Sequence, residues 1–120
     1  MCPGIGTRMS DQAEPSHHNV LHVEEKYDDD EATIVIVGEF DLTGTEPFSG
    51  TVDEVLATRP ESVVLEARGL TFIDSSGLMA LMRARDAATE AGAAFRIDEP
   101  SPALRRIVEI SGLEDLLPAE

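Results

Sequence analysis

The hydrophobic and polar positions alternate between runs that predict strands and periods that predict helices. Residues 20–24 suggest a short first strand, and residues 32–40 form a longer run that is β-branched and nearly all apolar. The longer run is typical of a strand that is covered on both faces. The acidic link at residues 28–31 is short, so we expect the two strands to pair as an antiparallel hairpin.

A helical period follows the second strand. Thr45 is the expected N-cap, Pro47 fits the first turn, and the Arg-Pro pair at 59–60 ends the pattern. The apolar face of this helix consists of Phe48, Val52, Val55 and Leu56. The next apolar run, at residues 62–67, predicts a strand that residues 69–73 carry onward.

A second helix is predicted to begin at Ser75 or Ser76 and to end at Ala91, where Gly92 is suited to close it. Its inward face consists of Leu78, Leu81, Met82, Arg85 and Ala88. The small or polar residues 74–77 connect the preceding strand to this helix. The segment therefore joins an apolar strand to an amphipathic helix through a very short link.

The last third of the chain predicts a strand at residues 94–98 and a third helix. Ser101 is the expected cap, Pro102 suits the first helical position, and Gly112 stops the helix. Its inward residues are Leu104, Ile107 and Val108. Residues 113–117 are expected to form a last short strand or turn that packs back on the sheet.

Strands that alternate with helices predict an α/β fold. We expect one domain at residues 20–120, with a mainly parallel sheet of four to five strands, a hairpin at its N-terminal edge, and three to four covering helices. Residues 1–19 are rich in Gly, Pro, Ser, Asp and His without an apolar period, and are expected to form a flexible N-terminal tail.

The charge of the chain narrows the choice of partners. Asp and Glu number 24 against 9 Lys and Arg, which gives a formal net charge of −15. Such a surface repels phosphate backbones and anionic lipids, so we expect neither nucleic acid nor a membrane as a partner. The charge suits a partner with a basic face, and it equally suits a small protein that is kept soluble and monomeric.

No apolar run approaches the ~20 residues that a membrane span requires. The first six residues lack the apolar core of a signal peptide, so we expect a cytoplasmic protein. Cys2 is the only cysteine, which excludes an internal disulfide. The histidine pair at 17–18 has no further ligand cluster beside it, so we expect no metal and no cofactor.

The chemistry of the chain is concentrated in residues 71–78. Here Asp74, Ser75, Ser76 and Gly77 connect an apolar run to a helix. The first N–H groups of a helix lack internal partners and carry partial positive charge. A serine at this point either caps the helix or carries a phosphate that those N–H groups hold. The local sequence alone leaves both interpretations open.

Catalysis by either serine is not supported by the pattern. A nucleophile elbow has Gly two residues before its serine, but Ile73 and Asp74 stand there. No histidine lies outside the N-terminal region to act as a base, and no glycine-rich phosphate loop joins a strand to a helix. We therefore expect no enzyme activity.

Three separated stretches, at residues 37–41, 70–78 and 101–113, carry a resemblance to a known family. In their order and spacing they resemble the STAS domain of bacterial anti-sigma factor antagonists. The resemblance covers residue 20 to the end of the chain, and its central motif is the most specific part. Met79 departs from the pattern, because many relatives have glycine at that position; it either selects a partner or is merely tolerated.

The resemblance implies partner switching in transcription regulation. The unphosphorylated antagonist binds an anti-sigma factor that is itself a serine kinase, a sigma factor is released, and phosphorylation dissolves the complex. It implies Ser75 as the phosphoacceptor, with Ser76 as the secondary candidate, and a PP2C-type phosphatase that restores the active form. The implied partner-binding residues are Asp41, Asp74, Ser76, Gly77 and Met79. The alternative is a STAS subunit that only docks in a larger assembly, of the stressosome or lipid-transport type.

Overall fold

The computed structural model describes residues 20–113. Its elements are β2 (His22–Asp28), β3 (Glu31–Phe40), the short 3₁₀ helix η1 (Leu42–Gly44), α1 (Thr45–Ala57), β4 (Ser62–Ile73), α2 (Ser75–Glu90), β5 (Ala94–Asp98) and α3 (Pro102–Ser111). The predicted tail at residues 1–19 and the predicted last element after Leu113 lie outside the described residues.

The four described strands form one sheet in the order β2-β3-β4-β5. β2 is antiparallel to β3, whereas β4 is parallel to both β3 and β5. The predicted α/β fold with a hairpin at one edge is therefore confirmed. The sequence predicted the first strand at residues 20–24, whereas β2 extends to Asp28. Pairing with β3 extends β2 over charged residues, which a strand at the edge of a sheet can expose to water.

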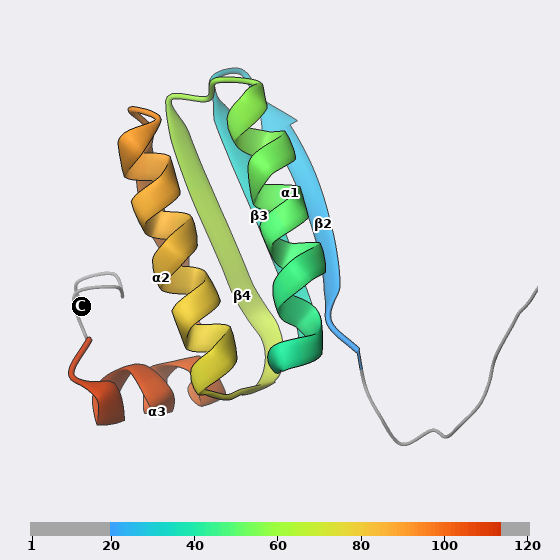
Figure 1. Cartoon of the computed structure of the whole chain (residues 1–120), viewed down its shortest axis with the longest axis vertical. Helices are drawn as coiled ribbons and strands as arrows, with labels where there is room; N and C mark the ends of the chain where they lie inside the picture. Colours follow the sequence, from blue (N-terminus) through green and yellow to red (C-terminus); the bar gives the residue numbers. More distant parts are fainter. Residues whose placement is uncertain (1–19, 114–120) are drawn as a thin grey trace, which may run out of the picture.

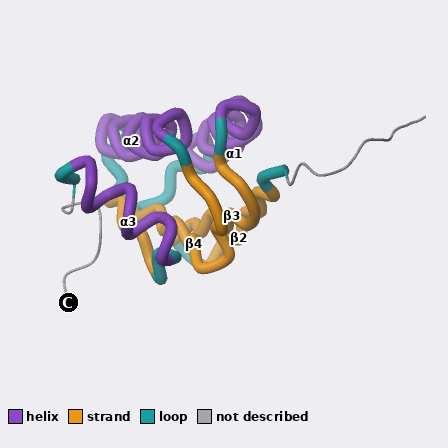
Figure 2. Tube along the Cα trace, turned by 90° about the horizontal axis from the view of Figure 1, so that it is seen from below, coloured by secondary structure: helices purple, strands orange, loops and turns teal. Residues whose placement is uncertain are grey.

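Helices α1 and α2 lie side by side over the same face of the sheet, and α3 crosses near the end of the sheet where β4 terminates (Figures 1 and 2). The core fills the space between the sheet and these helices. Phe40 of β3 and Phe48 of α1 meet there edge to face, with ring centroids 5.0 Å apart. The fully buried core also includes Ile34, Ile36, Val55, Leu65, Leu70, Leu81, Ile97, Leu104 and Val108.

Strand β3 is covered on one face only. Ala32, Ile34 and Ile36 are buried under the helices, but Val37, on the opposite face, is 43% exposed. The expectation of cover on both faces is thus wrong. The apolar run predicted two covered faces because valine and isoleucine are favoured in any strand, exposed or not.

The C-terminal ends of α2 and α3 and the start of α3 follow the predictions, whereas the start of α1 does not. Gly92 and Gly112 adopt the left-handed backbone that ends α2 and α3, and the Ser101 hydroxyl accepts a hydrogen bond from the Leu104 N–H at 3.2 Å. Thr45 is not the cap of α1, which has Gly44 at that position. The hydroxyl of Thr45 instead donates to the Leu42 carbonyl at 2.9 Å, because η1 precedes α1 directly.

Candidate functional site

The two acidic residues of the predicted site leave neighbouring parallel strands at the same edge of the sheet. Phe40, the last residue of β3, is in register with Ile73, the last residue of β4. The Asp74 N–H donates to the Phe40 carbonyl at 3.2 Å. Asp41 and Asp74 therefore each follow one of two paired residues and begin at the same end of the sheet.

The carboxylate of Asp74, and not a serine, caps α2. Asp74 has extended backbone angles, and its side chain accepts a hydrogen bond from the Gly77 N–H at 3.0 Å. The Leu78 N–H donates to the Asp74 carbonyl at 3.0 Å, which closes the first turn. Among residues 20–113, nothing accepts a hydrogen bond from the N–H groups of Ser75 and Ser76. Because Asp74 takes the capping role, both serine side chains are left for other functions.

Ser75 is the first residue of α2, and its side chain is exposed. No hydrogen bond joins its hydroxyl to any residue of the described part. Met79 lies one turn further on, so the two side chains share a face of the helix, and Met79 is 51% exposed. Ser76 is only half-buried, on the neighbouring face. The hydroxyl of Ser75 is thus accessible to a protein partner.

Asp41 organises the loop beside Ser75. Its Oδ1 accepts hydrogen bonds from the Thr43 N–H at 3.0 Å and from the Thr43 hydroxyl at 2.6 Å, and so caps η1. Leu42 stands next to it with 70% of its surface exposed. The sequence interpretation missed Leu42. Its signal was a large apolar side chain that falls outside the periods of both the strand and the helix.

Gly77 is buried, and its position is set by packing. A Cβ atom there would lie 2.6 Å from the Phe40 carbonyl oxygen and 2.9 Å from Cγ1 of Ile73. Any larger residue would push the start of α2 away from the ends of β3 and β4. Because Gly77 has no side chain, the start of α2 can pack close to the ends of β3 and β4. Direct contact between Gly77 and a partner stays a prediction.

The described residues offer little for other chemistry. Within 20–113, no group of three or more His, Cys, Asp or Glu side chains is arranged to hold a metal ion. None of the helices in this same range has the length and apolar character of a membrane span. The pKa of Tyr27 is raised by desolvation and by the nearby Glu25 carboxylate, but this residue lies on β2, away from α2.

Removing the cap tests this arrangement. Asp74→Ala is expected to lower the free energy of unfolding by about 1 kcal/mol, because the Gly77 N–H loses its acceptor. Urea unfolding followed by circular dichroism measures the change. Asp74→Asn keeps an acceptor oxygen and is expected to lose less. Ser75→Ala removes no hydrogen bond and is expected to change stability by under about 0.5 kcal/mol. A larger loss from Ser75→Ala than from Asp74→Ala would contradict the assignment of the cap.

The sheet, the helices and the serine at the start of α2 define an α/β protein with an exposed helix-terminal site. A family model described as "Mlab, STAS domain" matches residues 23–118. The chain therefore belongs to the STAS domain family, as the sequence motifs predict. A STAS-domain containing protein of Pseudomonas aeruginosa (strain UCBPP-PA14) is 36% identical over 89 residues, which cover 74% of this chain and 87% of that protein.

Solved structures with the same fold include two anti-sigma factor antagonists. The one from Mycobacterium paratuberculosis superposes with a TM-score of 0.72 at 21% identity, over 82% of this chain and 83% of that one. SpoIIAA in its unphosphorylated form gives 0.69 at 19% identity, over 82% and 86%. Its phosphorylated form, described as a Bacillus cell fate determinant, gives 0.64 at 19% identity, over 82% and 89%. At identities of 19–21% the structural similarity shows a shared fold only.

Proposed function

We propose that this protein is an anti-sigma factor antagonist that binds an anti-sigma factor with serine kinase activity and is switched off by phosphorylation of Ser75. The observation that carries the proposal is the exposed hydroxyl of Ser75, which has no hydrogen-bond partner among residues 20–113 and stands at the open N-terminus of α2. In this proposal the chain acts as a binding protein and as the substrate of its partner's kinase activity. Ser76, which is less exposed, is the secondary phosphoacceptor.

A phosphate on Ser75 is compatible with the folded state. It adds about −1.5 to −2 charges beside the N–H groups of Ser75 and Ser76, which have no acceptor in the described structure. The partial positive charge of the helix start favours an anion at that place. The phosphorylated chain therefore stays folded, and the modification acts on the surface that a partner meets.

The same phosphate is expected to weaken binding of the partner. Asp41 and Asp74 already place two acidic residues at this end of the sheet, directly after the paired residues Phe40 and Ile73. Two further negative charges at an interface raise like-charge repulsion and the cost of desolvation. Leu42 and Met79 supply the apolar contacts of the unphosphorylated surface, and Met79 is an adaptable one. Binding and release thus use the same small area.

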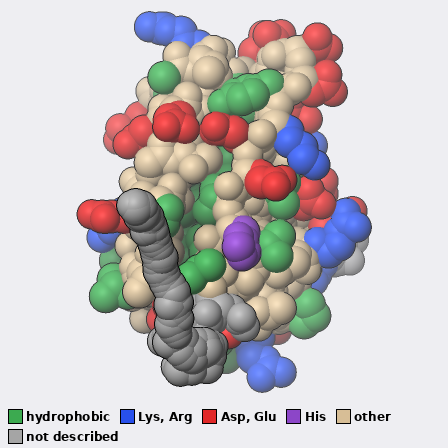
Figure 3. All heavy atoms as spheres, turned by 90° about the vertical axis from the view of Figure 1, so that its right-hand side faces the viewer, with side chains coloured by type: hydrophobic (Ala, Val, Ile, Leu, Met, Phe, Trp, Pro, Cys, Tyr) green, Lys and Arg blue, Asp and Glu red, His purple; other side chains and the backbone are tan. Residues whose placement is uncertain are grey.

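The remaining surface is consistent with a basic partner. The face that Figure 3 shows carries scattered acidic side chains, with basic side chains lying mainly toward its margins. Over the whole chain acidic residues outnumber basic ones by 24 to 9, which gives the net charge of −15. Long-range attraction to a basic surface raises the rate of association and depends on salt. The proposed kinase is therefore expected to present a basic surface to this chain.

The proposal is tested with purified candidate anti-sigma kinases and ATP. Wild-type protein is expected to gain one phosphate, which tandem mass spectrometry assigns to Ser75, and a PP2C-type phosphatase is expected to remove it. Ser76→Ala is expected to be phosphorylated like wild type, and Ser75→Ala is expected to remain unmodified. Phosphate on Ser76 in the wild-type chain would contradict the assignment of Ser75 and would make Ser76 the phosphoacceptor.

Binding without phosphorylation would favour the alternative function, a STAS subunit that docks in a larger assembly. In that case a stable complex would form with a candidate partner, ATP would leave it intact, and Ser75→Asp would bind as wild type does. The family assignment would be unchanged, because it rests on the sequence match and not on the switch.

A further inference from the structure

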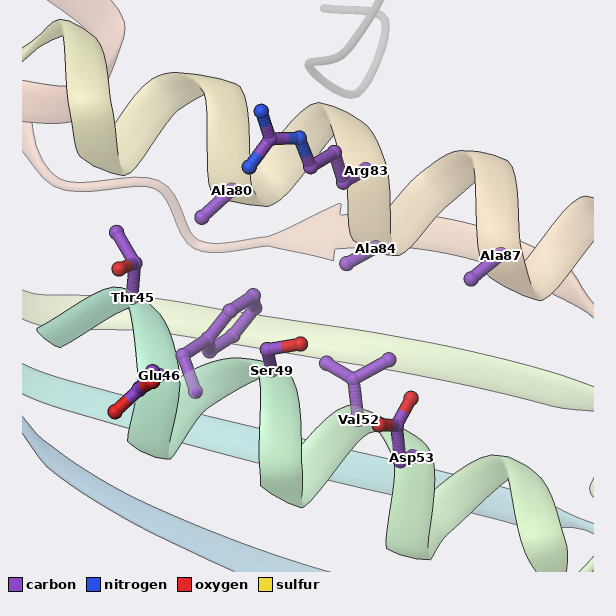
Figure 4. Close-up of a pocket in the computed structure, with 10 residues that line it drawn as sticks. Thr45, Glu46, Ser49, Val52, Asp53, Ala80, Arg83, Ala84 and Ala87 are labelled. Carbon is purple, nitrogen blue, oxygen red and sulfur yellow. The ribbon is translucent and has the colours of Figure 1, made fainter.

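A groove runs between α1 and α2 on the outer side of the helical layer (Figure 4). It has a cavity volume of about 330 Å³. The side chains of Thr45, Ser49 and Val52 point from α1 toward α2, and the methyl groups of Ala80 and Ala84 point back (Figure 4). Ala87 completes the α2 side. The groove is separate from the proposed phosphorylation site, which lies at the end of α2.

The floor of the groove is apolar, and its two rims carry opposite charges. Phe48 and Val52 are buried beneath it. Glu46 and Asp53 stand on the α1 rim, and Arg83 stands on the α2 rim. Within the described residues none of these three charges forms a hydrogen bond or an ion pair, not even across the groove. The rims are therefore open to charges that a partner supplies.

We infer that the groove receives an amphipathic α-helix of the binding partner, which places basic residues against Glu46 and Asp53 and an acidic residue against Arg83. This inference rests on the proposed function, since it gives the same partner a second contact. The groove begins at Thr45, directly after η1, and Ala80 lies one turn beyond Ser76 on the same face of α2. One partner can thus reach both the groove and Ser75.

The length of the groove fits two turns of a helix. The lining residues of α1 extend from Thr45 to Asp53, and those of α2 from Ala80 to Ala87. At a rise of ~1.5 Å per residue these segments are about 10–12 Å long. Anchors at positions i, i+3 or i+4, and i+7 of a docked helix span about the same length. The alanines and Ser49 are small, which lets such a helix approach closely.

Other occupants fit less well. An extended strand gains affinity by pairing its backbone with a sheet edge, but the walls here are helices whose backbone groups are bonded internally. A small anion would meet Arg83 with Glu46 and Asp53 on the opposite rim. An occupant that carries both signs of charge on its two flanks and an apolar stripe between them satisfies all three features.

The test uses two designed lactam-bridged peptides of about 15 residues, long enough for a stable helix once bridged. Both carry Leu at i, i+4 and i+7. The mixed peptide has Lys on one flank and Glu on the other, and the basic peptide has Lys on both flanks. Fluorescence anisotropy measures their affinities for the full chain, and ¹⁵N NMR locates the bound peptide. Shifts are expected in residues 45–53 and 80–87.

Arg83→Glu is expected to raise the ratio of affinities, basic peptide over mixed peptide, by about fivefold relative to wild type. Arg59→Glu has the same charge change beyond the far end of α1, and is expected to leave the ratio within about twofold of wild type. Ser49→Trp is expected to block both peptides sterically. Equal ratios for the two Arg variants, or shifts outside the groove, would overturn the inference.

Ser75→Asp separates this inference from the proposed switch. The apolar anchors and charged flanks of the peptides are designed for residues 45–53 and 80–87, which do not include Ser75. Their affinities are therefore expected to stay within about twofold of wild type in Ser75→Asp. If the peptides bind as described while no candidate kinase phosphorylates Ser75, the inference about the groove is supported and the proposed phosphorylation switch is contradicted. If the kinase phosphorylates Ser75 but Arg83→Glu leaves the ratio of peptide affinities unchanged, the proposed switch is supported and the inference about the groove is contradicted.

Discussion

Ser75→Asp is expected to weaken binding to the anti-sigma kinase by about two orders of magnitude, equivalent to ~3 kcal/mol. The substitution places a carboxylate on the exposed first residue of α2, at the edge that already carries Asp41 and Asp74. At an interface the added charge is repelled and must also lose its hydration. Isothermal titration calorimetry or biolayer interferometry with the purified kinase, without ATP, measures the effect.

Ser75→Asn is the matched control for this prediction. It has nearly the same shape as Ser75→Asp but no charge, so it is expected to lose less than about tenfold in affinity. Ser75→Ala is expected to bind like wild type and to stay bound when ATP is added. Because the repulsion is electrostatic, raising the salt concentration is expected to narrow the gap between the Asp and Asn variants. Equal losses for these two variants would indicate steric exclusion instead of charge.

Gly77→Ala is expected to lower the free energy of unfolding by about 2 kcal/mol. The new methyl group would lie 2.6 Å from the Phe40 carbonyl oxygen, which is backbone and cannot rotate away. Forcing an extra carbon into packed surroundings costs ~1–3 kcal/mol, and the better helix propensity of alanine offsets up to ~1 kcal/mol of it. Urea unfolding followed by circular dichroism measures the net change.

Gly50→Ala provides the matched control, since it makes the same substitution inside a helix. Gly50 lies within α1, and a Cβ there would meet nothing within 4 Å. Alanine at this position is expected to raise stability by about 0.5–1 kcal/mol through helix propensity alone. If Gly77→Ala were stabilising by a similar amount, the close contact between α2 and β3 would not exist as described.

The predicted loss at Gly77 bears on the proposed switch as well as on stability. The hydrogen bond from the Asp74 N–H to the Phe40 carbonyl uses the same oxygen that the new methyl group would approach. A shift of α2 would therefore also move Ser75 relative to Asp41. Kinase binding by Gly77→Ala is expected to weaken even at temperatures where the variant is fully folded.

The sequence determined the helices, the strands and the family. Alternating apolar runs and helical periods predicted the correct order of the described strands and α-helices, because each pattern matches the repeat of its own secondary structure. The short helix η1 was not predicted. Serine, proline and glycine marked both ends of α3 correctly, since capping depends on neighbours within a few residues. The three stretches at residues 37–41, 70–78 and 101–113, in their order and spacing, carried enough information to identify the STAS family.

The tertiary structure decided features that depend on residues far apart in the chain. Asp74 caps α2 in place of a serine, and Gly44 stands at the cap of α1 in place of Thr45, because the strand ends fix where each helix can begin. The exposure of Leu42 and the groove between α1 and α2 arise from packing between elements, which no local pattern encodes. By itself the sequence placed a serine at a helix start; only the meeting of Phe40 with Ile73 brought Asp41 and Asp74 to the same edge, because register between parallel strands is a tertiary property.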